Sequence, residues 1–316
     1  MSPGRAYPAP HGRTAQRLRW EFLPRGIRAR VEARIGTTVV RADSRDAGFT
    51  PGFASVLTGA DGSRHFVKAA SVQAQRLIAD SYREEARKLA ALPPGVPAPR
   101  LRWSFDEDGW VALGIEHLDA RNPRRPWRAV DLDAALDALE AMAEALTPAP
   151  PGLALDTFEQ EFAGFPGGWE HVDRVRPAWP CRDQAAALAA SYVPVTAGDT
   201  LVHTDVRDDN LLLDGSGRMW VCDWNWPVTG AAWLDSLFCL IGPRGDGLDV
   251  EAVIRTRPLL RDVPPEHVDV VLALLVGFFV QQQDQPVPPT SPYLRAHQAW
   301  QGEVCWDWLC ERRGWT

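Results

Sequence analysis

The chain has 316 residues, of which 45% are hydrophobic and 24% charged, enough for two adjoining lobes with a sizeable core. The net charge of −7 argues against a nucleic-acid partner, and even the apolar run 270–280 is too short to span a membrane. The five cysteines show neither metal-ligand spacing nor a paired framework, which fits a reducing cytosol. Residues 1–17 lack the apolar core of an export signal, so we predict a flexible leader on a cytoplasmic protein.

A helical pattern over residues 15–35, interrupted by a proline, predicts a helix that packs on the sheet that follows. The first strand is predicted at residues 39–41. The next segment carries Gly48, Gly52 and the hydroxyl of Ser55 in a turn. Because glycine has no Cβ, backbone N–H groups of such a loop can approach phosphate oxygens closely. An ordinary Pro-Gly hairpin turn is the alternative interpretation.

The strand at residues 65–69 carries Lys68 among apolar neighbours, where a lysine is out of place unless an anion meets it. An edge-strand lysine that deters aggregation is the alternative. Residues 79–92 have helical periodicity and stop at a Pro-Pro pair. Within this helix Glu85 borders the buried stripe rather than the solvated face, although a plain surface carboxylate remains the alternative.

Two more strands, at residues 100–105 and 110–115, complete the smaller lobe, and the remainder of the chain is mostly helical. Helices are predicted at residues 132–146, opened by Asp131, and at 184–193, 231–242, 251–257, 266–283 and 293–312. Acidic residues in the later helices are interpreted either as amine ligands or as solvated helix faces. They are Asp246, Asp249, Glu251, Asp262, Glu266, Asp269 and Asp284.

The most informative segment spans residues 201–223. His203 and Asp205 follow a short apolar strand, Asn210 comes five residues after Asp205, and a predicted hairpin then ends at Asp223. This hairpin brings Asn210 and Asp223 to the same end. An amide oxygen and a carboxylate suit Mg²⁺ held between protein and nucleotide phosphates, and Asp205 is left to orient or deprotonate an attacking hydroxyl. Each residue alone is also typical of a surface loop, so the spacing carries the interpretation.

These residues resemble the aminoglycoside/macrolide phosphotransferase family, whose catalytic loop has the pattern His-x-Asp-x-x-x-x-Asn and whose metal aspartate stands in Asp-Trp. Here the residues are His203-Thr-Asp205-Val-Arg-Asp-Asp-Asn210 and Asp223-Trp224. The resemblance implies an α+β, protein-kinase-like fold of two lobes, a small antiparallel-sheet N-lobe and a mostly helical C-lobe. The expected divisions are a leader and helical extension at 1–35, an N-lobe at 36–116 and a C-lobe at 117–316.

The resemblance also implies a nucleotide site. Lys68 and Glu85 are expected to pair and to orient the α and β phosphates, beneath a covering loop that runs from Gly48 through Gly52 to Ser55. The backbone of a hinge between the lobes is expected to bind the adenine edge. The hinge residues are Glu116, His117 and Leu118.

Within the catalytic loop the resemblance assigns catalytic positions to Asp205, His203 and Arg207. Many family members have Gly after the first His and a second His before the Asn, where this chain has Thr204 and Arg207. Arg207 is interpreted either as the partner of a neighbouring aspartate or as a charge that faces phosphate. Asp235 is expected to brace the loop from a helix start, with a simple helix N-cap as the alternative.

Only twelve residues separate Asp223 from Asp235, too few for the activation segment of a protein kinase, which favours a small-molecule acceptor. We therefore predict a kinase that uses ATP or GTP and Mg²⁺ to phosphorylate a hydroxyl of an antibiotic-like or metabolite substrate, with no nucleic-acid, membrane or obligate protein partner. A catalytically silent nucleotide-binding module with the same fold is the alternative. A hydrolase is disfavoured because the sequence has no Gly-x-Ser-x-Gly motif.

Overall fold

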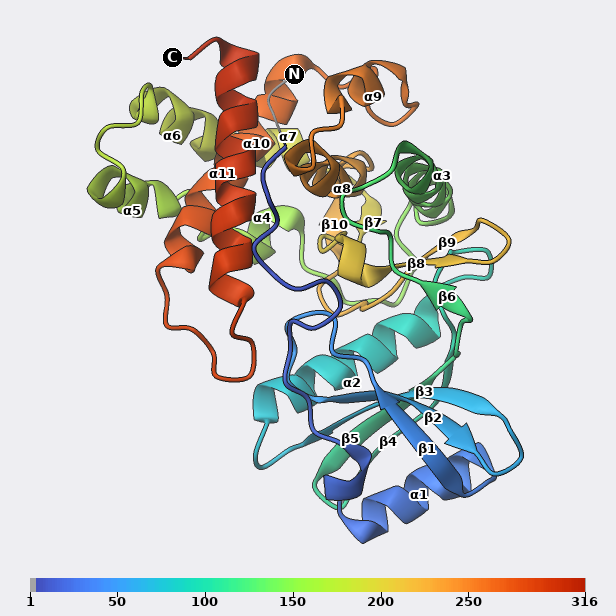
Figure 1. The fold of residues 1–316 in the computed structure, drawn as a ribbon. Helices are drawn as coiled ribbons and strands as arrows, with labels where there is room; N and C mark the ends of the chain where they lie inside the picture. Colours follow the sequence, from blue (N-terminus) through green and yellow to red (C-terminus); the bar gives the residue numbers. More distant parts are fainter. Residues whose placement is uncertain (1–3, 316) are drawn as a thin grey trace.

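The first lobe is a five-stranded antiparallel sheet with one helix on each face (Figure 1). The computed structural model describes residues 4–315. The strands are β1 (Val39–Ser44), β2 (Phe53–Gly59), β3 (Arg64–Ser71), β4 (Leu101–Glu107) and β5 (Trp110–Ile115), in the order β1-β2-β3-β5-β4. This arrangement, followed by a mostly helical second lobe, confirms the predicted α+β two-lobe fold.

The two helices of this lobe pack on opposite faces of the sheet. Helix α1 (Arg25–Ile35) buries Ile27 and Val31 against Phe53 and Leu57 of β2. Helix α2 (Arg76–Ala91) packs against β3 and β5. The helix predicted from residue 15 begins only at Arg25, after a short 3₁₀ turn, η1 (Trp20–Phe22), because Pro24 has no N–H to continue a helix across it.

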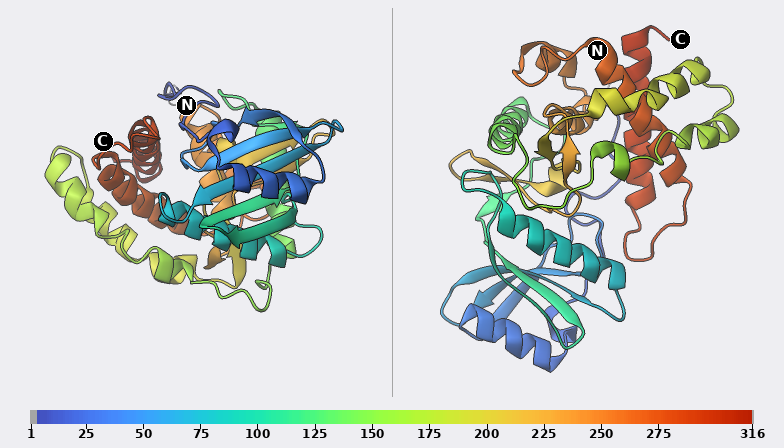
Figure 2. Two further views of the ribbon diagram at one scale, coloured as in Figure 1. Left: turned by 90° about the horizontal axis from the view of Figure 1, so that it is seen from below. Right: turned by 180° about the vertical axis from the view of Figure 1, so that it is seen from behind.

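The second lobe is built around a helix that is buried on nearly all sides, α10. It packs against α11, α5, α6 and α7, and Figure 2 shows α5 and α6 outermost beside α10 and α11. The helices are α3 (Ala129–Ala145), α4 (Phe158–Glu161), α5 (Gly168–Val175), α6 (Arg182–Ala190), α7 (Tyr192–Thr196), α8 (Leu234–Gly245), α9 (Val250–Thr256), α10 (Pro265–Gln283) and α11 (Leu294–Arg313). None of the helices within residues 4–315 is long and apolar enough to cross a membrane.

The sequence predicted the long helices but missed α4 and α5, which have only four and eight residues. It also misplaced the start of α3. That helix begins at Ala129, and Asp131 lies inside its first turn, where it binds the guanidinium groups of Arg121 and Arg128 instead of opening the helix. Helices as short as α4 and α5 hold too few turns for a helical periodicity of their apolar residues to be visible in the sequence.

The catalytic segment is held by short strands. Strand β7 (Thr200–Val202) pairs with β10 (Val228–Gly230), and a 3₁₀ turn, η2 (Asp208–Asn210), leads into the predicted hairpin of β8 (Leu211–Asp214) and β9 (Met219–Val221). A two-residue strand, β6 (Ala120–Arg121), pairs with β8 just after the chain enters this lobe.

Residues 4–17 of the predicted flexible leader make specific contacts with both lobes, and residues 1–3 of that leader lie outside the described residues. We call residues 4–19 the N-terminal strap, because they run along the second lobe and then reach the first (Figure 1). Arg5 donates its backbone N–H to Gly245 O at 2.7 Å and pairs with Glu303 and Asp307 of α11. The ring of Tyr7 lies under the guanidinium of Arg125, 4.0 Å from its central carbon.

Candidate active site

A cavity of about 550 Å³ lies between the lobes. One wall is the sheet, where alternate residues of β2 and β3 face the cavity because side chains alternate along a strand. These apolar lining residues are Ala54, Val56 and Phe66, joined by Ile115, Leu212 and Trp224. Charged residues line the other end, among them Lys68, Glu85 and Asp223. An apolar slot that opens onto a charged end is complementary to a nucleotide, with its flat base and its phosphates.

Lys68 forms the centre of the charged end. Its Nζ donates to both carboxylate oxygens of Glu85, at 2.7 and 2.8 Å, and to Oδ1 of Asp223 at 2.7 Å. Burial raises the pKa of Asp223, but the Lys68 ammonium outweighs that effect and lowers the pKa to about 2. Burial also lowers the pKa of Lys68, yet the two carboxylates together raise it well above its usual range. Lys68 and Asp223 are therefore both charged throughout the physiological pH range.

Asn210 and Asp223 leave suitable oxygens for a divalent cation. The amide nitrogen of Asn210 donates to the backbone and carboxylate oxygens of Asp205, at 2.8 and 2.9 Å, so its Oδ1 is not the atom that Asp205 engages. Lys68 and Asn225 both donate to Oδ1 of Asp223, and no donor to Oδ2 is found among residues 4–315. Both residues line the cavity between the lobes. An amide and a carboxylate oxygen fit Mg²⁺, which keeps waters and phosphate oxygens as its other ligands.

His203 was predicted at a catalytic position, but it is fully buried and lines neither of the cavities described in this section. Its Nε2 lies 2.9 Å from Cys222 O, and its Nδ1 accepts the backbone N–H of Asp205 at 3.3 Å. The ring also meets Trp224 edge to face, with centroids 4.9 Å apart. Both ring nitrogens of His203 are thus engaged by backbone atoms of the catalytic segment, an arrangement that fits a role in positioning the loop.

Asp235 also binds the backbone of the catalytic loop. Its carboxylate accepts the backbone N–H of His203 at 2.7 Å and that of Thr204 at 2.8 Å, and it caps no N–H of its own helix, α8. Thr204 has a φ of +68°, a left-handed conformation that costs a β-branched residue about 1–3 kcal/mol. Glycine adopts this conformation freely, which gives a physical reason for the glycine that many family members have here. In this chain Asp235 and a hydrogen bond from Thr204 Oγ1 to Trp226 O hold the strained residue.

Arg207 pairs with two carboxylates of its own loop. Its guanidinium binds Asp209 through two hydrogen bonds of 2.9 and 3.0 Å and also contacts Oδ1 of Asp205. Burial raises the pKa of Asp209, but Arg207 outweighs that effect and lowers the pKa below its usual value. The pairing interpretation thus fits the geometry, although the group is partly buried rather than on the surface. Asp208, the other aspartate next to Arg207 in the sequence, binds Arg125 instead.

The three residues predicted for the loop that covers the phosphates, Gly48, Gly52 and Ser55, have different positions in the structure. Gly48, with a φ of +84°, lines the cavity together with Ala47 and Thr50. Gly52 is required for another reason, because a Cβ there would lie 2.4 Å from Oη of Tyr82. Ser55 is buried inside β2, and it does not line the cavity as its neighbours Ala54 and Val56 do. The structure therefore separates Ser55 from the predicted phosphate loop.

The hinge residues Glu116, His117 and Leu118 all line the same cavity. The backbone N–H of Glu116 already donates to Arg100 O at 2.8 Å, and its carboxylate binds Arg102. The backbone groups of His117 and Leu118 have no such partner within residues 4–315, so they are the ones available to a nucleobase edge.

Sequence reasoning missed Arg17, which reaches the cavity from the N-terminal strap. Its guanidinium donates to Ala47 O at 2.9 Å and to Gly52 O at 3.4 Å, so it fastens the β1–β2 loop. Burial raises the pKa of Glu85 to about 7, and the Lys68 ammonium and, more weakly, the charge of Arg17 oppose that rise. Both cations also lower the pKa of Asp223, which places Arg17 close to the phosphate end. No local pattern marks this residue, because its partners lie thirty or more residues away.

Sequence reasoning also missed a second cavity, of about 290 Å³, on the other side of the catalytic loop. Asp205, Thr204 and Arg207 form its edge, and residues of α4, α8, α10 and α11 form its walls. Asp205 thus faces a space separate from the larger cavity, with Asn210 and Asp223 lining the latter.

The fold and the site together define a two-lobed, protein-kinase-like phosphotransferase. A family model described as "Phosphotransferase enzyme family" matches residues 52–261, more than half of the chain. The chain belongs to this phosphotransferase enzyme family, which confirms the resemblance seen in the catalytic segment. No curated protein matches the chain by sequence.

Solved structures share the fold at low sequence identity. A thermostable mutant of the aminoglycoside phosphotransferase APH(4)-Ia, in a ternary complex with AMP-PNP and hygromycin B, is 16% identical with a TM-score of 0.61, covering 93% of this chain and 100% of that one. The choline kinase LicA from Streptococcus pneumoniae is 12% identical with a TM-score of 0.56, covering 92% and 98%. A putative fructosamine-3-kinase from Haemophilus somnus 129PT is 14% identical with a TM-score of 0.54, covering 88% and 96%. Identities this low support the shared fold alone.

Proposed function

We propose that the protein is a small-molecule kinase that transfers the γ-phosphoryl group of ATP or GTP to a hydroxyl group. The observation that carries the proposal is that Asp205 lines the smaller cavity, while Asn210, Asp223 and Lys68 of the same site line the charged end of the larger one. The nucleotide occupies the larger cavity and the acceptor the smaller one. The relatives bound to AMP-PNP and hygromycin B, or named as choline and fructosamine kinases, favour a small acceptor.

In this mechanism the acceptor hydroxyl attacks the γ-phosphorus, and the bond from that phosphorus to the oxygen it shares with the β-phosphate breaks. Asp205 orients the hydroxyl and accepts its proton, while the nucleoside diphosphate leaves with the electron pair of the broken bond. Lys68, held by Glu85, positions the phosphates. Asn210 and Asp223 would hold Mg²⁺, which would supply charge neutralisation at the phosphate oxygens.

The proposal is tested by incubating the protein with a panel of hydroxylated antibiotics and metabolites and MgATP or MgGTP. We expect mass spectrometry to find a product that carries one added phosphoryl group, and we expect EDTA to abolish its formation because the phosphates then lose their counter-charge. Magnesium-dependent thermal stabilisation by the nucleotide, without any phosphorylated product, would instead favour the silent nucleotide-binding module.

Arg17→Ala is expected to raise KM for the nucleotide about tenfold or more, because a charged hydrogen bond is worth about 1.5–3 kcal/mol. Its effect on kcat should be smaller, since Arg17 lines the nucleotide cavity and not the acceptor cavity. Initial rates over a range of ATP concentrations measure the change. Arg13→Ala is the matched control, because Arg13 is exposed in the same strap. Equal increases in KM for both variants would contradict a specific role for Arg17.

A further inference from the structure

The acceptor cavity has an aromatic wall. The ring centroids of Phe158 and Phe162 are 4.3 Å apart, and those of Phe162 and Phe165 are 4.8 Å apart. Phe165 stacks on Phe278 with centroids 4.0 Å apart and planes 7° from parallel, and Phe278 adjoins Phe279 at 5.3 Å. All five rings line the cavity and form one continuous surface. Such a wall has no hydrogen-bonding groups to replace the water around a highly hydrated group, but it binds apolar and flat surfaces well.

Carboxylates are scarce in this cavity. Among the residues within 4–315 that line it, only Asp205 and Glu161 are acidic, and Arg207 already contacts Asp205. Glu161 is exposed at the end of α4. A molecule with several ammonium groups would lose much of their hydration here without gaining matching partners. The cavity is therefore poorly suited to a polycation, despite the net charge of −7.

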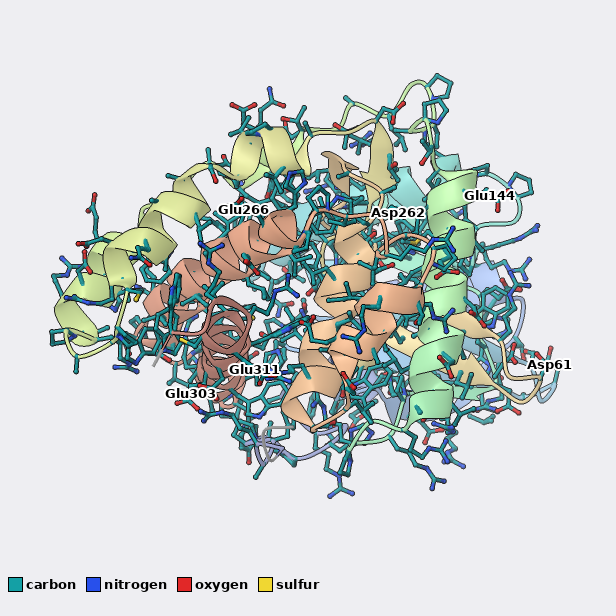
Figure 3. All side chains as sticks on the ribbon, turned by 90° about the horizontal axis from the view of Figure 1, so that it is seen from above. Asp61, Glu144, Asp262, Glu266, Glu303 and Glu311 are labelled. Carbon is teal, nitrogen blue, oxygen red and sulfur yellow. The ribbon has the colours of Figure 1, made fainter. Side chains whose placement is uncertain are left out.

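The acidic residues of the later helices do not supply the missing charge, because none of them lines the acceptor cavity. Most have partners elsewhere: Asp246 binds Arg125, Glu251 and Asp269 bind Arg312, Asp284 binds His171, and Asp249 caps α9. The two other residues of this set, Asp262 and Glu266, are labelled in Figure 3, together with Glu303 of α11. The interpretation of these residues as amine ligands therefore has no support from their positions.

The remaining polar groups at the cavity are neutral. Gln298 and Gln301 of α11 and Thr204 offer hydrogen bonds without charge. Burial lowers the pKa of His297 to about 3, so this lining residue is a neutral imidazole. At the rim, the side chain of Trp226 is 55% exposed, a large aromatic surface that water covers poorly.

Resting on the proposed kinase function, we propose that the acceptor is an uncharged alcohol with an aromatic or otherwise flat apolar body. Its body packs between the phenylalanine wall and Trp226, and its hydroxyl lies at Asp205. The volume of about 290 Å³ lies just below the usual range for ligand cavities, about 300–1,000 Å³, so the buried part of the acceptor is small.

The test compares two probes, naphthylethanol as an uncharged aryl alcohol and kanamycin as a polycationic sugar, by calorimetric titration into the protein with MgADP. Naphthylethanol is expected to bind, and Phe278→Ala to weaken it about tenfold, because a stacking partner of the ring is lost. Phe278→Leu keeps an apolar side chain and should retain most of the affinity. Phe22→Ala is the matched control, since Phe22 is 69% exposed on η1, outside the cavity.

Tighter binding of kanamycin than of naphthylethanol overturns the proposal, as does equal weakening by Phe278→Ala and Phe22→Ala. A failure of the proposed kinase function gives a different result from a failure of the proposed acceptor class. Naphthylethanol that binds through Phe278 but is never phosphorylated supports the apolar cavity and counts against phosphoryl transfer. Kanamycin that is phosphorylated while naphthylethanol does not bind supports the kinase and refutes the apolar acceptor.

Discussion

Asp205→Ala is expected to lower kcat for phosphoryl transfer by about 10²–10⁴-fold, the usual contribution of a positioned general base. The KM for the nucleotide should change little, because Asp205 lines the acceptor cavity and not the nucleotide cavity. Single-turnover assays with the first acceptor identified by mass spectrometry measure the rate of the chemical step, and calorimetry with ADP measures nucleotide binding. The loss should therefore fall on the chemical step alone.

The matched control for this variant is Asp209→Asn, which alters the second carboxylate bound to Arg207 while leaving Asp205 in place. We expect its kcat to stay within about tenfold of the parent protein, since Arg207 retains its contact with Asp205. A near-normal kcat for Asp205→Ala, or an equal loss in both variants, would show that the carboxylate of Asp205 is not the proton acceptor.

Lys68→Met is expected to destabilise the fold by about 3–5 kcal/mol at neutral to alkaline pH, because it leaves the buried carboxylates of Glu85 and Asp223 without their cation. The sign of the pH dependence follows from the pKa shifts. In the parent protein the pKa of Asp223, lowered from 3.8 to about 2, contributes stability above pH 3.8 that is lost as the pH falls through 2.

Burial already raises the pKa of Glu85 to about 7 in the parent protein. Without Lys68 that pKa rises further and the pKa of Asp223 rises as well, so the folded variant is most stable when both carboxylates are protonated and loses stability as the pH rises. The difference in melting temperature between parent and variant should therefore be larger at pH 8 than at pH 5. Lys88→Met is the matched control, since buried Lys88 donates to the carbonyl oxygen of Asn225 and its loss leaves no carboxylate unpaired. A difference that shrinks between pH 5 and pH 8 would contradict the assigned charges.

The periodic parts of the fold could be predicted from the sequence. Long helices such as α2 and α10 repeat their apolar residues over several turns, and the hairpin between Asn210 and Asp223 has strands on both sides of a glycine turn. Ser55 shows the limit of this approach. Its face of the strand depends on where the strand begins, and a start at Phe53 turns the serine away from the cavity.

The acceptor cavity could not be predicted, because no local pattern joins its walls. Phe165 and Phe278 stack although more than a hundred residues separate them, and helix periodicity alone marks Phe278 only as a core residue. The contacts that hold the N-terminal strap in place are equally distant in sequence, since Arg5 and its partner Asp307 are 302 positions apart. A composition rich in Pro, Gly and Arg is typical of a leader until its distant partners are known.

The N-terminal strap gives the two lobes a second mechanical connection. The first is the hinge at residues 116–118. The second is the strap itself, which runs from Arg5, paired with Asp307 of α11, to Thr14 and Arg17, which hydrogen-bond the loop that contains Gly48. Two bodies joined at one point can swing in several directions, whereas two bodies joined at two points keep mainly the rotation about the line between those points. We therefore expect opening and closing of the nucleotide cavity to be mainly a rotation about the line that joins residues 116–118 to the contacts of Thr14 and Arg17.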